Sequence, residues 1–152
     1  MKLAEALILR ADCQKRIEQL KSRLLRNARI QEGEAPAEDP SSLIAELESV
    51  AAELVGLIKR INKTNSLTVF ADGRSIADAL AERDVLVLRR SALADLAVLA
   101  STRHDRITRS EVKYFSTVNV SDTQRQADDL SKTYRELDAR IQEVNWQTEL
   151  IT

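Results

Sequence analysis

The spacing of apolar residues between positions 40 and 64 constrains the fold more than any other feature of this chain. Apolar residues recur there at alternating steps of four and three, the period that places them along one face of an α-helix. They are Leu43, Leu47, Val50, Leu54, Leu57 and Ile61. A second apolar row beside them consists of Ile44, Ala51 and Ile58. Because a two-stranded coiled coil needs only one narrow row, the wider face favours a helix packed against several neighbours.

Similar spacing elsewhere in the chain predicts three more helices. The four predicted helices cover about residues 2–31, 40–64, 75–101 and 121–149. Asp39 followed by Pro40 reads as an N-cap with proline in the first helical position. The chain has only five glycines and prolines among 152 residues and few aromatics, a composition that favours long helices over sheets. We therefore predict one all-α domain spanning residues 1–152, with four long helices in a bundle or antiparallel coiled-coil arrangement.

The third predicted helix is apolar on nearly every side, so we expect it to be the most enclosed element. Its charged residues Arg83, Asp84 and Arg90 cannot all reach water if neighbours cover the helix. Arg10 occupies a core position on the first helix. These four residues are candidates for buried ion pairs, or alternatively for the lining of a ligand pocket.

Two short segments in the connections read as β-strands, at about residues 66–70 and 112–120. Asp72-Gly73, after the first of them, is a turn signal. Either the two strands pair with each other, or each pairs with another subunit, because an isolated strand is marginal in water. We favour a role in assembly, with four candidate interface residues in the two segments: Phe70, Tyr114, Phe115 and Val118.

Trp146 is the fifth candidate for a subunit interface. The apolar stripe of the fourth predicted helix comprises Ala127, Leu130, Tyr134, Leu137, Ile141 and Val144. Trp146, the only tryptophan, falls on the opposite side of that helix. A lone outward-facing tryptophan is more often partly covered by its own chain than by a partner, but its position off the stripe supports a second contact surface, and both alternatives stay open.

Charge and composition restrict the cellular compartment and the classes of binding partner that we expect. The formal net charge is −1, and a basic first helix is balanced by an acidic fourth one, so we expect the helices to complement each other and expect no nucleic acid partner. No uncharged run is long enough to cross a membrane. Cys13 is the only cysteine, and the first residues lack the apolar core of an export signal, so we expect a cytoplasmic protein.

Motifs for catalysis or metal binding are scarce. A dimetal four-helix bundle needs two Glu-x-x-His pairs, whereas this chain has one histidine, His104, in a polar connection. Cys13 lies on the apolar stripe of the first helix, where a buried and unreactive thiol is expected. We therefore assign no catalytic residue, no metal ligand and no cofactor, and favour a binding or assembly protein over an enzyme.

Five blocks of the sequence resemble a known family. They are LAEALILRADCQKRIEQL, INKTNSLTVF, SIADALAERDVL, SEVKYFSTVNV and NWQTEL. Together they are similar to a family of small uncharacterised bacterial proteins, some of which carry the label septicolysin. The resemblance implies a helical, homo-oligomeric protein, and it supplies no catalytic residues.

Three functional hypotheses follow. The first is a non-enzymatic, homo-oligomeric assembly or interaction protein that uses Trp146 and the two strands. The second is a membrane-active lysin, as the septicolysin label suggests. The third is a small-ligand-binding protein or enzyme that uses the charges on the third helix.

Overall fold

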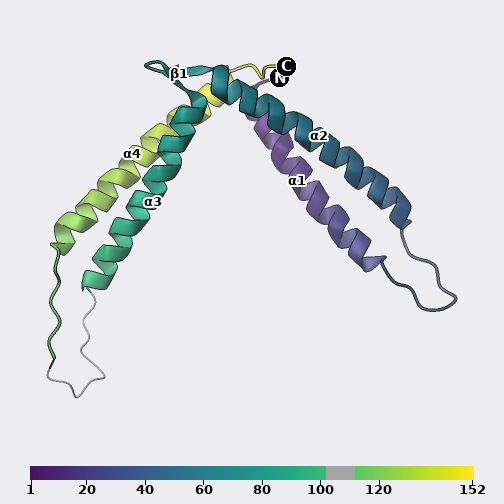
Figure 1. Ribbon diagram of the computed structural model, residues 1–152, viewed down its shortest axis with the longest axis horizontal. Coiled ribbons are helices and arrows are strands. Elements are labelled where there is room, and N and C mark those ends of the chain that lie inside the picture. Colours follow the sequence, from purple (N-terminus) through teal and green to yellow (C-terminus); the bar gives the residue numbers. More distant parts are fainter. Residues whose placement is uncertain (102–111) are drawn as a thin grey trace. The chain divides into compact units, whose positions relative to one another are not determined.

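The computed structural model describes residues 1–101 and 112–152, and within them it shows an all-α fold (Figure 1). The helices are α1 (Leu3–Arg26), α2 (Pro40–Leu67), α3 (Ile76–Ser101) and α4 (Val120–Gln147), and the strands are β1 (Val69–Ala71) and β2 (Arg74–Ser75). The predicted all-α fold class with four long helices is confirmed, and the structure also has two short strands, both in the connection between α2 and α3. The helix bounds agree with the predicted ones to within three residues, except that α1 ends five residues earlier than expected.

The chain forms two compact units where one domain was expected. Unit 1 comprises Met1–Ile76 and Glu143–Thr152, and unit 2 comprises Ala77–Gln142. Both ends of the chain therefore belong to unit 1, and unit 2 is an insertion between its two parts.

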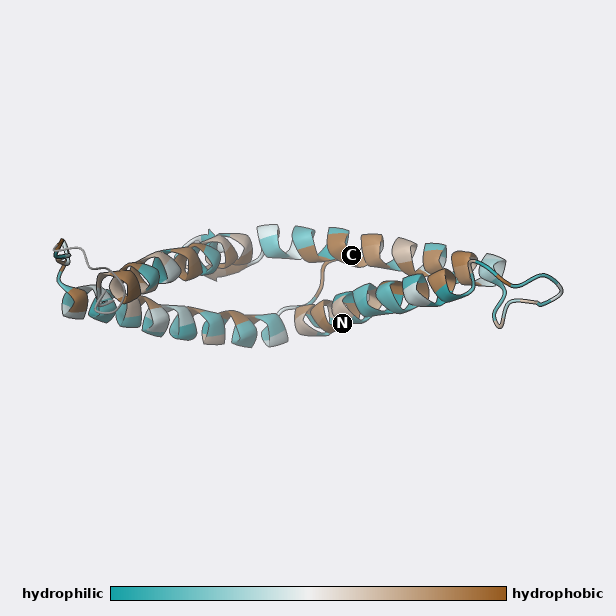
Figure 2. Ribbon diagram, turned by 90° about the horizontal axis from the view of Figure 1, so that it is seen from below, coloured by the Kyte–Doolittle hydropathy of each residue, from teal (hydrophilic) through white to brown (hydrophobic). Residues whose placement is uncertain are grey.

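Unit 1 is built on α1 and α2, which lie side by side and antiparallel (Figure 1). Apolar and polar residues alternate along the helices with the helical period, as the hydropathy colouring of Figure 2 shows. The buried side chains of this pair are Leu3, Ala4, Ala6, Cys13 and Leu20 of α1 and Leu43, Val50, Leu57, Ile61 and Thr64 of α2. The second apolar row of α2 is only partly covered, since half of the surface of Ile44 is exposed.

The connection between α1 and α2 is fixed at both ends by side chains. Asn27 follows the last residue of α1, and its Oδ1 accepts a hydrogen bond from the N–H of Glu38 at 3.1 Å. Arg23 Nε donates to both carboxylate oxygens of Glu38 at 3.1 Å, and this bonding lowers the pKa of Glu38. Asp39 accepts from the N–H groups of Ser41 and Ser42 at 3.3 Å, so the predicted N-cap of α2 is confirmed.

A tight hairpin joins β1 to β2. Asp72 and Gly73 both have positive φ, 51° and 78°, as a two-residue type I′ turn requires. The flanking residues Ala71 and Arg74 pair across the turn, and Val69 pairs with Ser75. The predicted strand at 66–70 is therefore present but shifted toward the turn, and its partner is β2, which has no strand-like sequence.

In unit 1, hydrogen bonds and ion pairs join the first residues of the structure to the last ones. Leu3 N–H donates to the carbonyl of Thr148 at 2.9 Å, and Leu150 N–H donates to the carbonyl of Met1 at 2.8 Å. Lys2 and the amino group of Met1 both contact the carboxylate of Glu149, at 2.6 and 3.2 Å.

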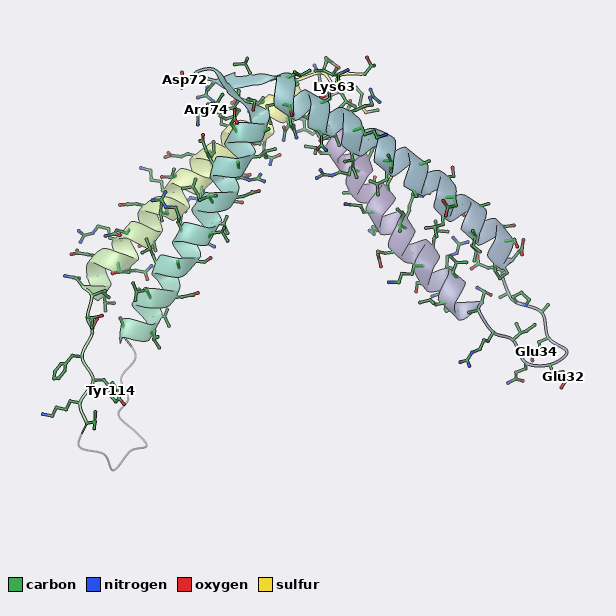
Figure 3. The ribbon with its side chains drawn as sticks, viewed as in Figure 1. Glu32, Glu34, Lys63, Asp72, Arg74 and Tyr114 are labelled. Atoms are coloured by element: carbon green, nitrogen blue, oxygen red, sulfur yellow. The ribbon has the colours of Figure 1, made fainter. Side chains whose placement is uncertain are left out.

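Side chains of α2 hold the residues that follow this bridge. Lys63 donates to the carbonyl of Thr152 at 2.9 Å, and Arg60 donates to that of Ile151 at 3.3 Å. Figure 3 marks Lys63 at this position. Through these bonds α2 contacts the last residues of the structure.

The strand predicted at residues 112–120 is absent. Residues 112–119 have irregular backbone, and α4 begins at Val120. Asn119 precedes this helix, and its Oδ1 accepts from the N–H of Asp122 at 3.0 Å. The alternating valines have no neighbouring strand with which to exchange hydrogen bonds among the described residues, and a pattern of this kind forms a strand only when it is paired.

Candidate interaction surface

Unit 2 is built on α3 and α4, which lie side by side (Figure 1). Arg83 of α3 donates to Asp138 of α4 at 2.9 Å and approaches its neighbour Asp84 at 3.4 Å. Burial alone would lower the pKa of Arg83, but its hydrogen bonds to Asp138 and Asp84 outweigh that effect and raise it. This ion pair therefore links the two helices across a half-buried contact.

Unit 2 leaves most of its large apolar side chains in contact with solvent. Among its described residues the buried apolar ones are Ala79, Leu86, Ala97, Ala127 and Ile141, and three of these five are alanines. The large apolar side chains that it exposes are Val85, Leu88, Leu96, Val98, Leu99, Val112, Tyr114 and Phe115. Scattered exposed apolar residues are ordinary, but a contiguous set on one small unit is typical of an interaction site.

Six of the seven exposed apolar residues of α3 form a continuous row, here called the α3 stripe, and Val98 lies outside it. The stripe consists of Ala81, Val85, Leu88, Ala92, Leu96 and Leu99. Steps of three and four residues place the row on one side of the helix, roughly opposite the side that carries the buried Ala79, Leu86 and Ala97. The prediction that this helix is the most enclosed element is wrong for the single chain, because α4 covers only one of its two apolar faces.

The four charged residues predicted to lie in buried ion pairs or a pocket have different environments. Arg83 is the one that is partly buried and paired, as described above. The Asp84 side chain is 71% exposed and Arg90 is exposed. Arg10 is half-buried, and within the described part of the chain it forms no ion pair. The structure therefore does not bring these residues together.

The five predicted interface residues are also dispersed. Phe70 is buried within unit 1, with the guanidinium of Arg74 5.8 Å from the centre of its ring. Tyr114 and Phe115 are 72% and 83% exposed on the segment that leads into α4, where Figure 3 labels Tyr114. Val118 is half-buried and Trp146 is 54% exposed.

The remaining features that bear on a small ligand or a metal are a cysteine, the metal-binding residue types and one hollow. Burial, followed by the nearby carboxylate of Glu53, raises the pKa of the Cys13 thiol, so this cysteine is mostly protonated at neutral pH. No cluster of metal-binding side chains is found within residues 1–101 and 112–152, and His104 lies outside these ranges. An open hollow of about 420 Å³ lies between the end of α3 and the start of α4, lined in part by Ser101, Arg125 and Asp128.

Over the part of the chain that the structure describes, no helix is both long enough and apolar enough to span a lipid bilayer.

Comparison with known proteins identifies relatives without an assigned activity. The model of a family of unknown function, DUF6847, matches residues 10–150. The chain is similar to a solved structure described as a functionally unknown conserved protein from Corynebacterium diphtheriae, with 45% identity over 99% of each chain and a TM-score of 0.94. None of the curated proteins matches this chain.

Proposed function

This chain belongs to DUF6847, a family of unknown function, and from its exposed surfaces we propose that it is a homo-oligomeric assembly protein whose second unit makes the contact between subunits. One observation carries the proposal. Among its described residues, unit 2 buries two large apolar side chains, Leu86 and Ile141, while it exposes eight. Association with a partner would remove the exposed ones from water and stabilise the unit.

The geometry of the unit explains why a partner is needed. Two helices side by side form a single layer, and each helix of such a pair covers only one face of the other. A stable domain normally packs a second layer against the first. Because α3 is apolar on two faces, only one of them is satisfied by α4, and assembly supplies the cover for the other.

The experiment that tests the proposal is sedimentation equilibrium combined with native mass spectrometry of the full chain. We expect one discrete oligomer over the micromolar range, since burying an interface of standard size gives affinities of that order or better. A protein that remains monomeric over this whole range would overturn the proposal.

A membrane-active, septicolysin-like function is the second candidate. The observation that favours it is the exposed group Val112, Tyr114 and Phe115 on either side of Lys113, since aromatic and basic side chains together suit a lipid surface. Release of a trapped dye from anionic and neutral liposomes distinguishes the two functions. The lysin predicts leakage that the double substitution Tyr114→Ser/Phe115→Ser abolishes, whereas the assembly protein predicts no leakage from either lipid.

A further inference from the structure

The α3 stripe follows a repeat of eleven residues. Ala81, Val85 and Leu88 recur eleven positions later as Ala92, Leu96 and Leu99. Eleven residues complete three turns at about 3.67 residues per turn, close to the 3.6 of a straight helix, so the repeat stays on one face. From Ala81 to Leu99 the stripe is about 27 Å long, at about 1.5 Å per residue. Its length and straightness suit a second helix lying alongside.

The side chains of the stripe are also suited to such a contact. Val85, Leu88 and Leu99 expose 51%, 68% and 71% of their surface, so each has much to gain from being covered. Ala81 and Ala92 are exposed and small, and each precedes a pair of larger residues along the stripe. Large and small side chains that alternate along a face allow two helices to interdigitate at about 8–10 Å between their axes.

Asp84 and Arg89, on opposite edges of the stripe, carry opposite charges. At about 100° per residue, Asp84 and Arg89 lie about 70° to either side of the midline between Val85 and Leu88. Both residues are exposed, and Arg89 forms no ion pair within the described residues. When two parallel helices pack face to face, the residue at one edge meets the residue five positions later at the opposite edge of the other helix. Asp84 and Arg89 are five positions apart.

We propose that the α3 stripe is a self-association surface, on which the α3 helices of two copies of this chain pack side by side and parallel. Asp84 of each copy then faces Arg89 of the other, and the two-fold symmetry makes this pair twice. The inference deepens the proposed function and rests on it, because it names the partner and the face through which the oligomer forms.

The charges also select the direction of the pairing. Two antiparallel helices oppose like edges. Asp84 and Asp95 share one edge of the stripe, so an antiparallel pair brings acidic edges together and leaves Arg89 without an acid opposite it at full overlap. Like charges placed together destabilise an interface, which favours the parallel pair.

The first test replaces an apolar residue of the stripe. Leu88→Glu should raise the dissociation constant of the oligomer by about thirtyfold or more, because it introduces a charge at the centre of the buried face. Leu67→Glu is the matched control, since Leu67 is 65% exposed at the end of α2 and lies outside the stripe. Sedimentation equilibrium gives the dissociation constants, and circular dichroism verifies that both variants keep their helices.

The second test exchanges the charges at the edges. Asp84→Arg and Arg89→Asp should each weaken the oligomer, and the double variant Asp84→Arg/Arg89→Asp should recover the affinity of the wild type, because the pair is re-formed with its signs reversed. Asp95→Arg is the control. Asp95 occupies the same place in the repeat as Asp84, but the residue five positions later is Ala100, so its reversal should change the affinity little.

The outcomes separate this inference from the function on which it rests. An oligomer that Leu88→Glu weakens and that the charge exchange restores supports the parallel pair. If Leu88→Glu weakens the oligomer but the exchange does not restore it, the parallel arrangement is wrong. An oligomer that Leu88→Glu leaves intact shows that another surface joins the subunits, so the inference fails and only the homo-oligomeric state of the proposed function stands. A monomeric wild-type protein overturns both.

Discussion

The hydroxyl of Thr64 in α2 accepts a hydrogen bond from the backbone N–H of Ile151 at 3.0 Å, across 87 positions of sequence. The same hydroxyl donates to the carbonyl of Arg60 at 2.8 Å, and the Thr64 side chain is fully buried. One buried oxygen therefore joins the last residues of the structure to the last turn of α2. This contact accounts for a polar residue at a position in α2 that would otherwise suit an apolar one.

We predict that Thr64→Val destabilises the chain by about 1–3 kcal/mol, because valine keeps the shape of threonine but leaves the N–H of Ile151 without an acceptor. Urea denaturation followed by circular dichroism measures the change. Thr64→Ser keeps the hydroxyl and should lose less. Equal losses in the two variants would show that packing, and not the hydrogen bond, is the source of the effect.

Glu149 makes the stability of unit 1 depend on pH in the acidic range. Hydrogen bonds from Lys2, and then from the amino group of Met1, lower the pKa of Glu149 in the folded chain. A carboxyl whose pKa is lower when folded stabilises the fold above its unfolded pKa, about 4.3, and that contribution is lost as the pH falls through the folded pKa.

Substitution at Lys2 tests this dependence. Lys2→Met removes the larger cause, so the pKa of Glu149 should rise toward its ordinary value and stability should fall less on acidification. Titration of the carboxyl carbon by NMR in both proteins measures the shift directly. An unchanged pKa in Lys2→Met would assign the effect to the amino group of Met1 instead.

Substitution by alanine should change the stability of the chain in opposite directions at Gly73 and at Gly56. A methyl group at either site meets no atom within 4 Å, so the difference is conformational. Gly73 has a φ of 78° in the hairpin turn, where an L-residue loses about 1–2 kcal/mol. Gly56 lies inside α2, where alanine is favoured over glycine by about 0.5–1 kcal/mol. Thermal unfolding should show a lower Tm for Gly73→Ala and a higher one for Gly56→Ala, and the same sign for both would contradict the assignment of the turn.

The ion pair between Arg83 and Asp138 should stabilise unit 2 only modestly. Their side chains are 23% and 31% exposed, so solvent screens the pair, and a double-mutant cycle with alanine should give a coupling of about 0.2–1 kcal/mol. Lys132 and Glu136 form the control, since they are 3.9 Å apart and each is 69% exposed. Their coupling should be smaller, and a larger value there would mean that burial does not govern these pairs.

The helices could be predicted because their information is local. Leu43, Val50 and Leu57 share one face by their spacing alone, and Asp39 and Pro40 signal the start of α2 without reference to the rest of the chain. Only part of the hairpin could be predicted. Asp72-Gly73 indicated the turn, whereas Arg74 and Ser75 have no residue types typical of a strand.

The partner of each face could not be predicted, because it depends on contacts distant in sequence. The valines of residues 112–120 alternate as in a strand, yet no described strand lies beside them, and the segment remains irregular. The apolar residues of α3 likewise indicated burial on all sides, and sequence alone does not distinguish a face that α4 covers from one left for another molecule. A repeat such as Val85/Leu96 was the available signal that α3 has two separate apolar faces.

The insertion of unit 2 between the two parts of unit 1 has a consequence for synthesis on the ribosome. The contacts of α3 with α4 join segments close in sequence, whereas unit 1 needs Leu3 and Thr64 to meet Thr148 and Ile151. Contacts between distant segments form slowly, and here they also require Thr148 and Ile151 to leave the exit tunnel. The hairpin of α3 and α4, with its apolar stripe already exposed, is therefore translated and free to fold before unit 1 closes around the last residues.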